Sequence, residues 1–116
     1  MGTWGYEIFE DDTTLDVRGV FEDALEAGAS VAEATHRVFE EMPEAVVDYD
    51  ECSLVWLALA ALQLEQGDLQ PWVKAPALVV IKHGIGLGRW KDEGPEELAK
   101  RKTALEAFRT LMTAER

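Results

Sequence analysis

The chain has 116 residues, enough for one domain, and 47% of them are hydrophobic. Its formal net charge is −12, and such an excess of carboxylates repels phosphate backbones and anionic membranes, so we expect neither as a partner. The longest apolar run is residues 54–62, whereas a membrane-spanning helix needs about twenty residues. With no signal-peptide pattern at the start, the sequence predicts a single cytoplasmic domain over residues 1–116.

The first part of the chain predicts a short extended segment followed by a helix. Residues 1–10 are rich in aromatic side chains and glycine, and the even spacing of Tyr6 and Ile8 is typical of extended backbone. From Val17 onward apolar residues recur at i, i+3, i+4 and i+7, which favours a helix over residues 13–27 with one buried stripe.

Two further helices are expected in the middle of the sequence. Ser30 and Glu33 have the spacing of a capping box, and Pro43 is expected to end the helix that this box begins. After an acidic loop, residues 51–65 are apolar on all sides, which is typical of a fully buried helix. This helix is therefore expected to be the central one.

The last third of the chain predicts two more helices. One begins near Pro71, but Pro76 lies inside it, so residues 77–81 are also compatible with a buried strand. The other covers residues 95–114. The expected fold is mainly α, with about five helices packed antiparallel around the apolar helix at residues 51–65.

The charge is unevenly distributed along the sequence. Residues 1–51 contain fifteen carboxylates and two basic residues, a net of −13, whereas residues 52–116 carry a net of +1. A surface with this potential would speed association with a cationic partner. The alternative is that the acidity serves solubility alone.

The opening of the sequence resembles a known family. Gly2-Thr3-Trp4-Gly5, followed by Phe9, Asp12 and Asp16, is similar to an uncharacterised bacterial family, domain of unknown function 4259. The chain departs from the family pattern at three positions, with Asp11 in place of Asn, Thr14 in place of Ala and Val17 in place of Trp. The resemblance implies no particular activity, but it directs attention to the N-terminal segment.

Aromatic residues surrounded by carboxylates are the candidate partner-binding residues, since aromatic side chains often anchor interfaces. Asp12 and Asp16 are four residues apart and would share a helix face, where they could alternatively hold a divalent cation, or Asp12 could cap the helix. The predicted partner-binding set is Trp4, Tyr6, Asp11, Asp12, Asp16, Glu40, Glu41, Asp48, Tyr49 and Asp50.

No catalytic arrangement stands out from the sequence. The two histidines, His36 and His83, have no ligand-spaced partners, so a zinc site has no support, and His36 is interpreted as plain surface. The glycine-rich stretch at residues 84–88 lacks a phosphate-loop signature and is interpreted as a turn, with a small anion as the alternative. No catalytic residue, metal or cofactor is assigned.

The sequence thus favours a non-catalytic acidic protein-binding module, for example an immunity-type or antitoxin-type inhibitor that covers a basic partner. Two alternatives remain open. One is an accessory helical domain whose acidity has no further role, and the other is a small metal protein that uses Asp12 and Asp16. A homodimer is compatible with each of them.

Overall fold

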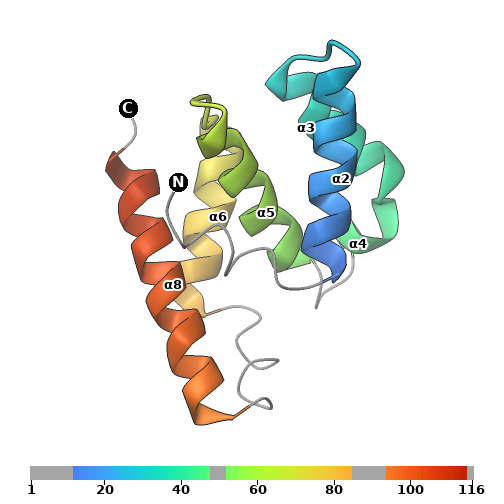
Figure 1. Cartoon of the computed structure of the whole chain (residues 1–116). Coiled ribbons are helices and arrows are strands. Elements are labelled where there is room, and N and C mark those ends of the chain that lie inside the picture. The colour runs from blue at the N-terminus through green and yellow to red at the C-terminus, as the bar shows by residue number, and fades with distance from the viewer. Residues whose placement is uncertain (1–11, 48–51, 85–93, 115–116) are drawn as a thin grey trace.

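The computed structural model describes residues 12–47, 52–84 and 94–114, and the regular structure within these ranges is helical (Figure 1). In chain order its helices are α2 (Asp12–Glu26), α3 (Val31–Glu41), α4 (Pro43–Val47), α5 (Cys52–Glu65), α6 (Pro71–His83) and α8 (Pro95–Ala114). The mainly α fold is therefore confirmed. The expectation of about five helices is one too low for the described ranges, and the extended N-terminal segment lies outside them.

The additional helix is α4, and Pro43 explains it. The helix α3 ends before this proline, with the Met42 amide donating to the Val38 carbonyl at 2.8 Å. Pro43 is then the first residue of α4, where its missing N–H is no loss because the first N–H groups of a helix have no intrahelical acceptor. The same proline therefore separates two helices.

The predicted capping box is present at the start of α3. The Glu33 amide donates to the Ser30 hydroxyl oxygen at 3.1 Å, and the Ser30 amide donates to the Glu33 carboxylate at 2.9 Å. These two bonds satisfy N–H groups that otherwise have no partner at a helix start. They fix the short turn between α2 and α3, in which Gly28 adopts a φ of 99° that favours glycine.

Residues 77–81 are helical, which decides between the two structures that the sequence allowed. They belong to α6, which contains Pro76 and ends at Gly84 in the left-handed conformation, with φ 63° and ψ 30°. Pro76 removes one helical N–H. The helix nevertheless continues, with Val73, Ala77 and Val80 buried along one face.

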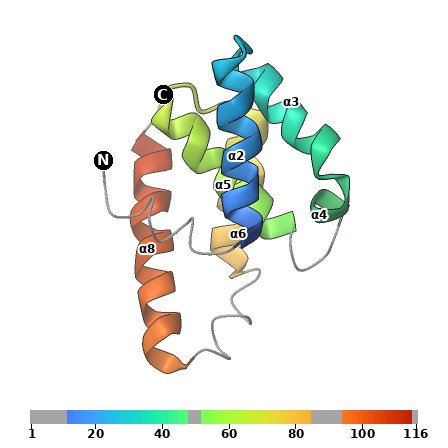
Figure 2. The ribbon, with the colours of Figure 1, turned by 45° about the vertical axis from the view of Figure 1, so that its right-hand side comes forward.

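The core is centred on α5, as the apolar sequence of this helix predicts. Ten of its 14 residues are buried. It packs against α2 on one side and α6 on the other, and α6 packs against α8. In Figure 1, α5 and α6 lie between α8 and the pair α2–α3, and in the turned view of Figure 2, α2 lies in front of them. Phe21 of α2 and Phe108 of α8 are the largest fully buried side chains in the described ranges.

Successive long helices run in opposite directions, as expected from the short connections. Following the colours of Figure 1, α2 and α3 are antiparallel, as are α5 and α6, and α6 and α8. The helices α2 and α5, which are not consecutive, point the same way. Within the described residues, no helix combines the length and the apolar character needed to cross a membrane.

A buried polar chain joins α3, α5 and the start of α6. The Gln63 side chain is fully buried, and its amide nitrogen donates to the Thr35 hydroxyl at 2.9 Å. Its carbonyl oxygen accepts from the Gln70 backbone amide, also at 2.9 Å. The Thr35 hydroxyl in turn donates to the Val31 carbonyl at 2.8 Å. This chain holds α3 in place beside α6.

Candidate functional site

The carboxylates of residues 12–47 are all exposed. This range contains nine carboxylates and two guanidinium groups, a net of −7, while residues 52–84 balance to zero and residues 94–114 carry a net of +1. The nine exposed side chains are Asp12, Asp16, Glu22, Asp23, Glu26, Glu33, Glu40, Glu41 and Glu44. The charge asymmetry of the sequence is thus an asymmetry between α2–α4 and the other described helices.

Two arginines pair with some of these carboxylates. Arg37 lies 3.7 Å from Glu40 and 3.6 Å from Glu41 on its own helix, so two of the predicted partner-binding residues already have a cationic neighbour. Arg18 lies 3.2 Å from Glu22. Exposed pairs of this kind contribute about 0.3–0.5 kcal/mol each. The six other carboxylates of residues 12–47 have no ion pair among the described residues.

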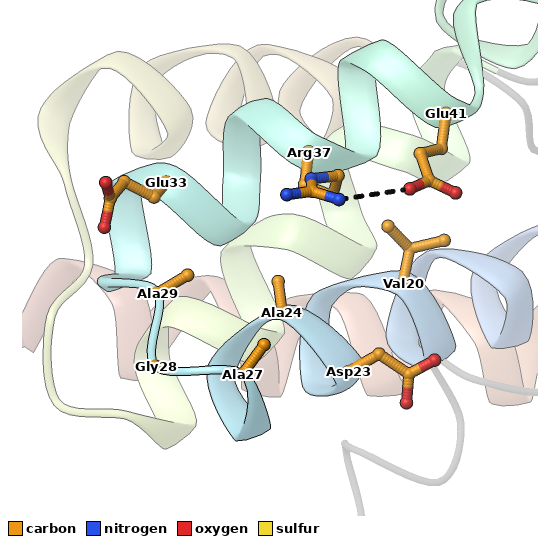
Figure 3. A pocket seen from close by; sticks show the side chains of 9 residues that line it. All are labelled: Val20, Asp23, Ala24, Ala27, Gly28, Ala29, Glu33, Arg37 and Glu41. Atoms are coloured by element: carbon orange, nitrogen blue, oxygen red, sulfur yellow. Dashed lines mark ion pairs between the residues drawn. The ribbon is translucent and has the colours of Figure 1, made fainter.

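A half-open hollow of about 430 Å³ lies between α2 and α3 (Figure 3). Val20 and Ala24 of α2, and Ala27 in the turn after it, point into the space between the helices, and Arg37 extends over this space from α3. The carboxylates that line the hollow lie at its edge. The lining residues are Val20, Asp23, Ala24, Ala27, Gly28, Ala29, Glu33, Arg37 and Glu41.

A second hollow, of about 330 Å³, continues toward the start of α2. It lies between α2 and the junction of α3 with α4, and it shares Glu41 with the first. Its lining residues are Thr13, Asp16, Glu41, Met42, Pro43, Glu44 and Ala45. We call the two hollows together the acidic trough, because five carboxylates and one guanidinium group line them.

The family follows from the sequence as a whole. The model of the family "Domain of unknown function (DUF4259)" matches residues 2–115. The chain belongs to this family. No curated protein and no solved structure matches it.

The trough of this DUF4259 chain includes some of the predicted binding residues and omits others. It brings together Asp16 and Glu41, whereas Asp12 and Glu40 are exposed but do not line it. The remaining predicted residues, namely Trp4, Tyr6, Asp11, Asp48, Tyr49 and Asp50, lie outside the described residues.

Three carboxylates of the trough were missed at the sequence level. Asp23 is seven residues after Asp16, a spacing that returns to the same helix face and could have identified it. Glu33 was interpreted only as a capping residue, and Glu44, although it belongs to the acidic stretch that begins at Glu40, was left out of the predicted partner-binding set. In the structure the hydrogen bond from the Ser30 amide, and secondarily the Ser30 hydroxyl, lower the pKa of Glu33 below its ordinary value.

The candidate metal site at Asp12 and Asp16 has no third ligand in the described part of this DUF4259 chain. No group of three or more histidine, cysteine, aspartate or glutamate side chains suited to hold a metal ion is found among those residues. Two carboxylates are too few for a calcium site in particular, since Ca²⁺ takes roughly six to eight oxygen ligands.

An aromatic cluster between α3 and α6 was also missed. The His36 ring stacks on Trp72 with ring centroids 5.5 Å apart, and Phe39 lies between Trp56 and Trp72 with centroids at 5.6 and 6.1 Å. The Trp72 indole N–H donates to the Gln70 side chain at 2.7 Å, and 40% of Trp72 is exposed. His36 is therefore exposed, as expected, but it is part of a helix–helix contact rather than isolated surface.

Glu65 of this DUF4259 chain is an acid whose pKa is shifted mainly by its burial. One of its oxygens lies 3.7 Å from Arg18, and the other is buried without a hydrogen bond. Burial raises the pKa of Glu65 above 4.5, while Arg18 lowers it and Glu22 raises it to smaller extents. The folded protein therefore holds this proton more tightly than the unfolded chain does.

We expect Glu65→Gln to reduce the pH dependence of stability. The wild-type contribution is most favourable below pH 4.5 and is lost as the pH rises through the raised pKa, because ionisation then places a charge at a largely buried position. The variant cannot ionise there. Thermal unfolding midpoints from about pH 4 to about pH 8 test this, with Glu26→Gln, an exposed change of equal charge on α2, as the control. Equal pH slopes in the two variants would contradict the expectation.

Proposed function

We propose that this chain is a non-catalytic protein-binding module whose acidic α2–α4 surface covers a basic surface on a partner protein, in the manner of an immunity-type or antitoxin-type inhibitor. The observation that carries the proposal is the exposure of all nine carboxylates in residues 12–47 against only two guanidinium groups. The other described helices carry nearly balanced charge.

Electrostatics of this kind act mainly on association. A surface of one sign raises the rate of encounter with an oppositely charged partner by about one to three orders of magnitude, and salt reduces the effect. A surface that serves solubility alone has no need to concentrate charge on three consecutive helices. The concentration of carboxylates on α2–α4, together with the trough between them, therefore supports a binding role.

The test is affinity capture of partner proteins from the native cells at low and high salt, followed by dissociation constants for the purified partner. The informative variant combines Asp12→Asn, Asp16→Asn and Glu44→Gln, which removes three carboxylates that have no ion pair among the described residues. We expect a basic partner whose affinity falls with salt and is weakened about tenfold by this triple change.

A matched control is available on α8. The combination of Glu96→Gln, Glu97→Gln and Glu106→Gln changes the net charge by the same amount on a different part of the molecule. We expect it to leave the affinity within about twofold of the wild type. Equal losses in the two triple variants, or capture of no basic partner at low salt, would refute the proposal.

A further inference from the structure

We propose that the acidic trough binds an extended basic segment of the partner through two arginine side chains three residues apart. This inference rests on the proposed function and specifies the chemistry that the acidic surface recognises. Its occupant is a segment of the type Arg-Xaa-Xaa-Arg, with small apolar residues between the arginines.

The spacing of two carboxylates on α2 sets the spacing of the arginines. Asp16 and Asp23 line the two hollows of the trough and are separated by seven residues, which is about 10.5 Å along a helix and returns to the same face. In polyproline II conformation, residues i and i+3 lie on the same side and about 9.3 Å apart. Two arginines in that register can each reach one of these carboxylates.

The two carboxylates are available for this contact. Asp16 and Asp23 are both exposed, and neither has an ion pair with a lysine or arginine in the described ranges. Arginine suits them better than lysine, because its planar guanidinium donates two parallel hydrogen bonds to one carboxylate. The trough does not suit an anion, since its one guanidinium, on Arg37, already lies beside Glu40 and Glu41.

The floor between the two carboxylates fits the middle of the segment. Val20 lies between Asp16 and Asp23 along α2, Ala24 comes directly after Asp23, and both point into the space beside α3 (Figure 3). Their small apolar side chains leave room for proline rings or for the methylene stems of the arginines, which pack readily on apolar surface. The arginines of the proposed segment therefore match the carboxylates at the edge of the trough, and its apolar middle matches the apolar side chains at the bottom.

Two capped peptides of equal composition test the inference, Arg-Pro-Pro-Arg and Arg-Arg-Pro-Pro. Both carry the same charge, but only the first places its arginines in the proposed register. We expect the first to bind about tenfold more tightly by calorimetry, and to shift the backbone amide resonances of α2 and of the turn that follows it. Equal affinities, or shifts located on other helices, would overturn the proposal.

Single variants locate the contact. Asp16→Asn and Asp23→Asn are each expected to weaken Arg-Pro-Pro-Arg about fivefold or more and to reduce its advantage over the other peptide. Glu26→Gln, on the same helix but outside the trough, is the matched control, and an equal effect there would refute the inference. If the peptides show no preference while the α2–α4 triple variant still loses its natural partner, the register is wrong and the proposed function stands.

Discussion

Phe21→Ala is expected to lower the free energy of unfolding by about 3–5 kcal/mol. The Phe21 side chain has no exposed surface and belongs to the core between α2 and the central helix α5. Truncation removes the apolar contacts and leaves a cavity, because the surrounding helices relax only partly. A loss of this size is a large share of the roughly 5–15 kcal/mol that stabilises a domain.

Denaturation by urea, followed by circular dichroism, measures the effect. Leu15→Ala is the control on the same helix, since 48% of Leu15 is exposed and its truncation creates no enclosed cavity. We expect this control to lose less than about 1 kcal/mol. Comparable losses in the two variants would show that Phe21 does not hold α2 on the core. The proposed acidic surface would also lose its support, because α2 carries much of it.

The helices were largely predictable because their boundaries depend on local chemistry. The Ser30–Glu33 capping box, Pro71 at a helix start and Gly84 at a helix end each act within a few residues, and each marks an observed boundary. The short helix α4 was missed because Pro43 both ends α3 and starts α4, whereas a proline after a helix is ordinarily interpreted only as a stop.

The choice between helix and strand for residues 77–81 needed information from distant parts of the chain. Val79, Val80 and Ile81 begin three residues after Pro76, and such a β-branched run favours a strand locally. Packing of Val73, Ala77 and Val80 on one face of α6, beside α5, overrides that preference. The burial of a helix stripe therefore outweighed both the local propensity and the missing N–H of the proline.

The candidate site was predictable in its charge but not in its shape. The excess of carboxylates in the first half of the chain is a property of composition. The trough depends on how α2 and α3 lie against each other, which no local pattern specifies. The pairing of Arg37 with Glu40 and Glu41, by contrast, follows the i, i+3 and i, i+4 spacing and could have been predicted.

The second large effect is expected from Gln63→Leu, which should lower the free energy of unfolding by about 1–3 kcal/mol. Leucine has nearly the same size as glutamine, so the change removes hydrogen bonds without opening a large cavity. The Gln70 amide loses its acceptor, and the Thr35 hydroxyl loses the donor from Gln63. A part-buried N–H without a partner is costly because it has given up its bond to water.

A double-mutant cycle with Thr35→Val separates this network from simple packing. Each single variant leaves the other side chain with an unsatisfied group, whereas the double variant removes both sides of the Thr35–Gln63 bond. We therefore expect the double variant to be more stable than the sum of the single losses predicts, by about 0.5 kcal/mol or more. Additive losses in urea denaturation would mean that this bond does not couple α3 to α5. The stacking of His36 on Trp72 would then have to hold α3 beside α6 without it.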